Sequence, residues 1–400
     1  MSTPKLRFKE FGGDWAKTSL NQITTKIGDG IHATPKYDDN GLIPFINGNN
    51  LINGNVKIFD NTKRINLDEF KKYSQKLSEQ TIFLSINGTI GNLAFYRNET
   101  VLLGKSVCFI SLAENVNPNF IYQLLQSPQI SKTFNAELTG TTIKNLSLAT
   151  VRNSEFYYPK KEEQTKIASF LSAVDQKISQ LTQKHELLSQ YKQGMMQKLF
   201  SQQIRFKADD GSEFEEWASK TLDEVANIVG GGTPSTIHEE YWNGDIVWLT
   251  PSEINQKFIK NSKRTISELG VQKSSAKKLP VGTVLFTSRA TIGEVAITTD
   301  ELTTNQGFQS FITNDNTLNE FLYYWIIHHK KDFVERASGS TFLEISKSKI
   351  QPMQIQLPCP EEQTKIANFL SAIDQKIEVV AQQIKQAKTW KKGLLQQMFV

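Results

Sequence analysis

One stretch of sequence occurs twice in this chain of 400 residues, and it restricts the possible folds more than any other feature. Residues 162–178 read EEQTKIASFLSAVDQKI and residues 361–377 read EEQTKIANFLSAIDQKI, with mild changes at only two positions. Each copy follows proline (Pro159 in the first, Pro358 and Pro360 in the second) and opens with glutamates, which suit the first turn of a helix. This repeat predicts two copies of one structural unit, each with a helix that begins here.

The apolar residues that follow predict two long helices that pair with each other. They alternate at spacings of three and four, at Leu171, Val174, Ile178, Leu181, His185 and Leu188 in the first copy and at Leu370, Ile373, Ile377, Val380, Ile384 and Ala387 in the second. This spacing is typical of a coiled-coil seam. A helix over 162–198 spans roughly 55 Å at 1.5 Å per residue and cannot cover its apolar stripe alone. Pairing of the two helices within the chain is the simplest solution, in either a parallel or an antiparallel sense.

A globular domain precedes each helix. We expect a domain over 1–158, a helix over 159–200, a second domain over 201–357 and a second helix over 358–400. The two domains match only at scattered anchor points, such as Thr-Ile-Gly at 89–91 and at 291–293. The helices therefore carry out one function twice, whereas the domains carry out two versions of another.

The domains mix strand and helix patterns. The runs at 81–86 and 283–288 are apolar and rich in β-branched and aromatic residues, which predicts strands. Aromatic and aliphatic residues at helical spacing predict helices at 119–126 and 319–329. We expect an α+β fold with a twisted, mostly antiparallel sheet in each domain.

Composition excludes some classes of protein. No run of about 18 apolar residues occurs, so we expect no membrane span, and residues 1–5 lead into no apolar stretch of the kind that a secretion signal needs. Cys108 and Cys359 lie far apart with no partner at metal-ligand spacing, which predicts a cytoplasmic protein without a zinc site. The net charge of +5 permits contact with phosphates, but an ordinary solvated surface explains it equally well.

Several patterns resemble catalytic motifs but lack the other residues that those motifs need. Gly104-Lys105-Ser106 looks like the end of a phosphate-binding loop, which requires a glycine where this chain has Glu99. Residues 117–120, Asn-Pro-Asn-Phe, differ from the tetrapeptide of amino-methyltransferases and are better explained as a turn that leads into a helix. His328-His329 has no further metal ligands and is expected to end a helix. We therefore predict a recognition function without catalytic residues or metal.

Polar loops at equivalent places in both domains are the candidate binding residues. Hydroxyl groups suit phosphates, and Arg, Asn and Gln can hydrogen-bond to base edges. The candidates for DNA contact are Thr34, Lys36, Asn47, Asn49, Ser85, Asn87, Thr89, Lys105, Ser106, Thr141, Thr142 and Lys144 in the first domain, and Thr233, Ser235, Thr250, Ser252, Ser288, Arg289, Thr291, Asn305, Gln306, Ser340 and Thr341 in the second. Each loop alone could be an ordinary hydrophilic loop, but recurrence at matched positions favours a shared binding face.

The run Pro-x-x-Glu-Glu-Gln-x-Lys-Ile-Ala-x-Phe-Leu, at 159–171 and at 358–370, resembles the signature of specificity subunits of type I restriction-modification systems. The order of domains and helices is similar to that family over essentially the whole chain. The resemblance implies two target recognition domains, each of which reads one half of a bipartite double-stranded DNA site. It also implies that the two helices form an antiparallel coiled coil and set the spacer between the half-sites.

The resemblance further implies partners. Two modification subunits, which use S-adenosylmethionine for adenine methylation, would dock on this chain, and restriction subunits, which use ATP and Mg, could join them. Because the helix starts are nearly identical, we expect matched docking sites at Glu162, Gln164, Ile167, Phe170, Glu361, Gln363, Ile366 and Phe369. This chain would hold no cofactor of its own. The alternative is a structural adaptor whose coiled coil joins two ligand-binding domains with no role on DNA.

Overall fold

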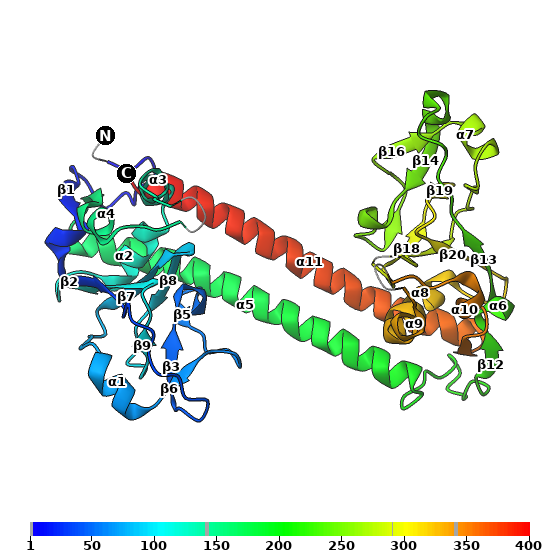
Figure 1. The fold of residues 1–400 in the computed structure, drawn as a ribbon, viewed down its shortest axis with the longest axis horizontal. Helices are drawn as coiled ribbons and strands as arrows, with labels where there is room; N and C mark the ends of the chain where they lie inside the picture. Colours follow the sequence, from blue (N-terminus) through cyan, green and yellow to red (C-terminus); the bar gives the residue numbers. More distant parts are fainter. Residues whose placement is uncertain (1–2, 141–143, 290, 340–342) are drawn as a thin grey trace. The chain divides into compact units, whose positions relative to one another are not determined.

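The computed structural model describes residues 3–140, 144–289, 291–339 and 343–400. The chain divides into two compact units, unit 1 (Met1–Gln183 and Ala381–Val400) and unit 2 (Lys184–Val380) (Figure 1). Two long helices, α5 (Lys161–Phe200) and α11 (Pro360–Met398), each contribute one part to each unit. In the described part of the chain, no helix is both long enough and apolar enough to cross a membrane.

Unit 1 is built on a four-stranded antiparallel sheet in the order β2-β10-β7-β8. A smaller sheet, β6-β3-β9, lies beside it, and two strand pairs, β1-β11 and β4-β5, complete the strands. The strands are β1 (Ala16–Ser19), β2 (Thr24–Asp29), β3 (Ile43–Ile46), β4 (Leu51–Ile52), β5 (Asn55–Val56), β6 (Arg64–Ile65), β7 (Thr81–Asn87), β8 (Thr89–Phe95), β9 (Leu102–Leu103), β10 (Val107–Leu112) and β11 (Glu155–Tyr158). The shorter helices are α1 (Leu67–Tyr73), α2 (Pro118–Leu125), α3 (Pro128–Ala136) and α4 (Leu148–Asn153).

Unit 2 repeats this plan. Its main sheet has the order β13-β20-β17-β18-β15, its smaller sheet the order β16-β14-β19, and β12 pairs with β21. The strands are β12 (Ala218–Thr221), β13 (Ala226–Gly230), β14 (Trp242–Leu249), β15 (Phe258–Ile259), β16 (Arg264–Ile266), β17 (Val284–Phe286), β18 (Val295–Thr298), β19 (Thr303–Thr304), β20 (Gln309–Thr313) and β21 (Gln354–Leu357). The shorter helices are α6 (Leu222–Val225), α7 (Glu268–Gln272), α8 (Asn319–His328), α9 (Lys330–Arg336) and α10 (Lys347–Ile350).

The predicted α+β fold is confirmed in both units. The expected strand at 81–86 is β7, which pairs with β8 through a tight turn at Gly88, where φ is +74°. That positive φ suits glycine, which has no Cβ to clash. The helix expected after the Asn-Pro turn is α2, whose first turn is capped because the side chain of Asn117 accepts from two backbone amides.

The long helices close the core of each unit. In unit 1, Ile167 and Leu171 of α5 are buried in one cluster with Phe120 of α2 and with Leu394 and Met398 of α11. Residues of the equivalent elements form the same cluster in unit 2: Ile366 and Leu370 of α11, Phe321 of α8, and Leu199 and Phe200 of α5. The start of one helix thus packs with the end of the other in both units, as it does in an antiparallel pair.

Candidate nucleic-acid interface

The glycine loop of unit 2 places two of the candidate residues side by side. A Cβ at Gly231 would lie 2.0 Å from the backbone oxygen of Asn305, so only glycine allows the two segments to approach this closely. As a result, the hydroxyl of Thr233 hydrogen-bonds to the side-chain oxygen of Gln306. Both side chains are exposed, which leaves their remaining hydrogen-bonding capacity open to a ligand.

Two tryptophans hold this loop in place. The indole N–H of Trp248 donates to the backbone oxygen of Gly232 at 2.8 Å, and that of Trp242 donates to the backbone oxygen of Ser235 at 3.1 Å. The guanidinium of Arg264 covers the Trp242 ring at 3.7 Å from its centroid. Both rings are nearly fully buried, so the loop backbone is fixed at both ends of the Thr233–Ser235 segment.

The turn after β14 adds to the same face. The backbone N–H of Asn305 donates to the oxygen of Leu249 at 3.0 Å, which brings Asn305 beside Thr250. Thr250 donates from its hydroxyl to Glu253 at 2.7 Å and lies 3.2 Å from the hydroxyl of Ser252. The structure therefore gathers Thr250, Ser252 and Asn305 into one cluster with Thr233 and Gln306.

The strand that leads out of β17 joins this cluster from the other side. The backbone N–H of Ser288 donates to the oxygen of Gly307 at 2.8 Å, although the Ser288 side chain itself is buried and points away from solvent. The neighbouring Arg289 is exposed and lies 3.4 Å from Glu344. Thr291 is exposed, and Ser340 and Thr341 lie outside the described residues.

Unit 1 has an equivalent cluster. The backbone N–H of Gly104 donates to the oxygen of Ile46 at 2.9 Å, which matches the bond between Asn305 and Leu249. The hydroxyl of Ser106 donates to Asn47 Oδ1 at 2.9 Å and accepts from the backbone N–H of Gly48 at 3.0 Å. The adjoining Lys105 and Asn49 are exposed, so this cluster differs from that of unit 2 in charge and in polar groups.

The β7–β8 turn completes the cluster of unit 1. Asn87 donates from its side chain to Asn145 at 3.3 Å, and the backbone N–H of Gly88 donates to the oxygen of Lys144 at 3.1 Å. Thr89 and Lys144 are exposed. Thr141 and Thr142 lie outside the described residues.

Three candidates of unit 1 are placed differently. Ser85 is fully buried, and its hydroxyl accepts from the backbone N–H of Asn92 at 2.7 Å, so it supports the turn from below. Thr34 and Lys36 are exposed, but the backbone N–H of Lys36 donates to Glu69 at 2.9 Å, which holds this segment against α1. The side chains of Ser85 and Ser288 are therefore not available to a ligand at the surface.

The two clusters share a backbone scaffold. Leu146 donates its N–H to the oxygen of Ile86 at 2.8 Å, and Ile345 donates its N–H to the oxygen of Ser288 at 2.9 Å. Parallel pairing of β3 with β9 recurs as parallel pairing of β14 with β19. The same main-chain bonds thus present different side chains, and exposed hydroxyl, amide and cationic groups of this kind suit phosphates and base edges. Across the described residues, no group of three or more His, Cys, Asp or Glu side chains could hold a metal ion.

The start of each long helix is anchored by a buried glutamate. Glu163 accepts from Arg7 Nε and Nη2, both at 2.7 Å. Glu362 accepts from Arg205 at 3.2 and 2.8 Å. The hydrogen bond to each glutamate is the main cause that raises the pKa of Arg7 and Arg205, with burial opposing it. Sequence reasoning missed these pairs, although Leu-Arg-Phe at 6–8 and Ile-Arg-Phe at 204–206 is a repeated signal.

Most of the predicted docking residues contact their own unit. Gln164, Ile167, Gln363 and Ile366 are buried within the described structure. Gln363, for example, accepts at Oε1 from the backbone N–H of Leu318 at 2.7 Å. Contacts inside the chain therefore account for much of the near-identity of the two helix starts.

The other four docking candidates lie nearer the surface. Phe170 and Phe369 are half-buried and pack edge-on against Phe8 and Phe206. Glu162 and its counterpart Glu361 are exposed and remain available to a partner.

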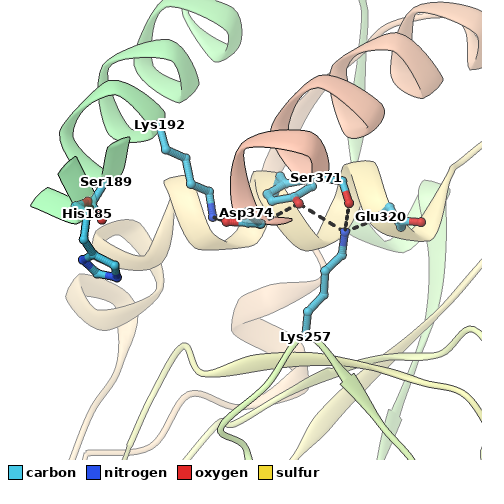
Figure 2. A network of polar contacts seen from close by, with 8 residues as sticks. His185, Ser189, Lys192, Lys257, Glu320, Ser371 and Asp374 are labelled. Carbon is cyan, nitrogen blue, oxygen red and sulfur yellow. Dashed lines mark hydrogen bonds and ion pairs between the residues drawn. The ribbon is translucent and has the colours of Figure 1, made fainter. Parts of the chain in front are cut away.

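Figure 2 shows a polar network that joins the globular part of unit 2 to α11. Lys257 donates from Nζ to Glu320 at 2.5 Å, to the Tyr324 hydroxyl at 3.1 Å and to the Ser371 hydroxyl at 3.2 Å. Glu320 and Tyr324 belong to α8, and Ser371 belongs to α11. One lysine therefore ties the segment before β15 to two helices, α8 and α11.

The same network links the two long helices. Asp374 of α11 accepts from the Tyr324 hydroxyl at 2.7 Å and from Lys192 of α5 at 2.5 Å. Burial, reinforced by the bond to Asp374, raises the pKa of Tyr324 far above its usual range. In unit 1, Asp175 of α5 and Lys391 of α11 make the matching pair at 2.6 Å. Lysine occupies equivalent positions of the repeat at 192 and 391, and this recurrence in the sequence is what could have indicated the two pairs.

Comparisons with known proteins agree with this duplicated architecture. The family model described as "Type I restriction modification DNA specificity domain" matches the chain twice, at residues 12–190 and 214–389. The type I restriction enzyme MjaIX specificity subunit of Methanocaldococcus jannaschii is 40% identical over 188 residues, which make up 45% of this chain and 43% of that relative. The putative type I restriction enzyme MjaX specificity subunit of the same organism is 24% identical and covers 98% of this chain and 94% of its own.

A solved structure shows the same fold. The type I restriction-modification system S subunit from M. genitalium superposes with a TM-score of 0.61 at 18% sequence identity, over 100% of this chain and 99% of that one.

Proposed function

Because this chain belongs to the type I restriction-modification DNA specificity family, we propose that it reads the DNA sequence for a type I restriction-modification complex. Each unit would contact one half of a bipartite double-stranded site. One observation carries this assignment: the loop clusters of the two units share their main-chain hydrogen bonds but present different side chains. A shared scaffold with different exposed groups is what two readers of different half-sites require.

We assign the chemistry to other subunits. Modification subunits with S-adenosylmethionine would methylate adenine, and restriction subunits with ATP and Mg would cleave DNA. The relatives named above are specificity subunits, and the first of them is matched over less than half of its own length. In our assignment this chain acts in the cytoplasm and supplies no catalytic residue or cofactor, and its exposed Glu162 and Glu361 belong to the docking surface for two modification subunits.

We further infer that the paired helices set the spacer between the half-sites. The α5 helix runs without interruption from unit 1 into unit 2. At 1.5 Å per residue, its length is about 60 Å. A continuous helix resists bending far better than a loop does, which supports this inference.

Methylome sequencing tests the assignment. A strain with the gene is expected to carry adenine methylation at a two-part, asymmetric sequence with a fixed spacer, and deletion of the gene should remove it. The DNA-free adaptor would leave the methylome unchanged. Methylation at one continuous site that depends on this chain would contradict the division into two readers.

A further inference from the structure

A basic groove lies in unit 1 between α3 and the end of α11. It has a volume of about 350 Å³ and is lined by Lys388, Lys391 and Lys392 of α11, with Gln126 and Asn135 opposite them. The wall next to the sheet is formed by Ile90 and Gly91 near the start of β8. Among the residues that the structure describes, no carboxylate lines the groove.

The three lysines differ in what they contact. Lys391 is nearly buried and is neutralised, because its Nζ lies 2.6 Å from Asp175 and donates to Gln126 at 2.9 Å. Lys388 and Lys392 are exposed, and in the part of the chain that the structure describes neither pairs with a carboxylate. They stand one helical turn apart, so both ammonium groups can face one anion. Two uncompensated positive charges therefore remain at the groove.

The groove and the candidate nucleic-acid face meet along the chain at the start of β8. Its wall at Ile90 and Gly91 directly follows Thr89, which is exposed in the cluster of unit 1. A Cβ at Gly88 or Gly91 would have no atom within 4 Å, so open space surrounds the turn. The start of β8 therefore leaves room for DNA bound at Thr89 to extend towards the lysines.

Unit 2 offers an internal comparison. Its groove at the equivalent place is lined by Ser189, Lys192, Gln193 and His329. Lys192 is neutralised by Asp374, just as Lys391 is by Asp175. By the repeat, Ser189 stands for Lys388 and Gln193 for Lys392. The two positive charges without a carboxylate partner, on Lys388 and Lys392, thus occur in unit 1 and not at the equivalent positions of unit 2. The shared fold does not need them.

We propose that Lys388 and Lys392 bind backbone phosphates of the DNA that flanks the half-site read by unit 1, and that unit 2 has no counterpart to this contact. This inference rests on the proposed function. Ammonium groups are ordinary phosphate ligands, and such contacts add affinity without reading sequence. Continuity with the Thr89 turn favours DNA over an acidic segment of a partner protein.

The test compares the chain with a variant that carries the unit 2 residues in unit 1. The complex with its modification subunits, containing either wild-type chain or K388S/K392Q, binds a duplex that carries the methylated site. Each lost phosphate contact lowers the slope of log K against log salt by about 0.9. For two contacts, the affinity of the wild type should fall about 12-fold more than that of the variant between 50 and 200 mM salt, as follows from that slope. Serine and glutamine already occupy these positions in unit 2, so the variant is expected to fold.

A second measurement uses the wild-type chain. Uncharged methylphosphonates are placed in the DNA flanking one half-site at a time. Weaker binding when the flank of the unit 1 half-site is neutralised, with no such loss for K388S/K392Q, supports the contact. Two results would overturn the phosphate contact. One is an equal salt slope for the two proteins. The other is loss of the modification subunits from the variant complex, which would indicate that the lysines bind a protein partner. A wild-type complex that binds no site at all would instead refute the proposed function.

Discussion

Removal of the buried carboxylate at the start of α11 should destabilise unit 2 by about 4 kcal/mol. Glu362 is fully buried and accepts three hydrogen bonds, two from Arg205 and one from the indole N–H of Trp217 at 2.9 Å. Loss of one member of a buried pair costs about 3–5 kcal/mol. The Arg205 side chain remains 19% exposed, so the lower figure applies, about 3 kcal/mol. The indole N–H then also lacks an acceptor, which adds about 1 kcal/mol.

The equivalent change in unit 1 should cost less. Within residues 3–140, 144–289, 291–339 and 343–400, Glu163 accepts only the two bonds from Arg7, whose side chain is 15% exposed. The indole N–H of Trp15, which corresponds to that of Trp217, is buried and has no hydrogen-bond partner in the described part of the chain. Glu163→Ala therefore removes the ion pair alone and is expected to cost about 3 kcal/mol. The difference of about 1 kcal/mol between the two variants measures the indole bond.

Urea unfolding of the full-length chain, followed by circular dichroism, measures both variants. The neighbouring exposed glutamates provide matched controls, since Glu162→Ala and Glu361→Ala should change the free energy of unfolding by less than about 0.5 kcal/mol. The reasoning is refuted if Glu362→Ala is no more costly than Glu361→Ala. It is also refuted if Glu163→Ala costs as much as Glu362→Ala, because the indole bond would then contribute nothing.

Three further variants probe unit 2. Burial lowers the pKa of His329, so the unfolded chain binds more protons than the folded chain near and below about pH 6.5, and the free energy of unfolding should fall as the pH drops from 7.5 to 5.5. His329→Gln should flatten this pH dependence in urea titrations. Parallel curves for the variant and the wild type would contradict the reasoning. Trp248→Phe removes the hydrogen bond to Gly232, which contributes about 1 kcal/mol. Methylation mapping should show relaxed base discrimination at one half-site only, and relaxation at both half-sites would count against a local effect. Asp374→Asn breaks the pair with Lys192 and should destabilise unit 2 by about 1–3 kcal/mol; a double-mutant cycle with Lys192→Met that gives no coupling would contradict this.

The helices and their pairing could be predicted because their signals are local. The repeated segment, the prolines before it and the 3-4 spacing all lie within one stretch of chain, and α5 and α11 follow them closely. The seam is confirmed by burial at Leu171, Val174 and Leu181. The periodicity did not decide whether the two helices pair in a parallel or an antiparallel sense. That sense depends on contacts between the helices, such as those that Asp175 and Asp374 each make with a lysine of the other helix.

The role of the helix starts could not be read in the same way. Glutamates at a helix N-terminus usually face solvent, so Glu163 and Glu362 look like surface residues in the sequence. Their arginine partners lie more than 150 positions away in the chain. No periodicity relates residues at that distance, and only the folded chain brings them together.

Burial of two site candidates has a related cause. A strand with one face in solvent would expose Ser85, but six consecutive residues of β7 are buried. One face of β7 packs with helices α2 and α5, and the other packs with the short strands β3, β4 and β9. Ser288, which corresponds to Ile86 of the same strand, is also buried. By contrast, Thr233, Gln306 and Thr89 follow glycines or precede them in turns, where side chains point outward, and these residues are exposed as expected.

Exchange of one recognition domain tests most directly that the two units read DNA independently. The strands β12 and β21 pair at Ala218 and Leu357, so the two cut points adjoin and residues 218–357 can be replaced by the corresponding domain of a relative while both long helices remain. Methylome sequencing of a strain with the hybrid chain should show that one half of the site has changed, with the other half and the spacer unchanged. Changes in both halves, or an unaltered site, would contradict the two-reader account.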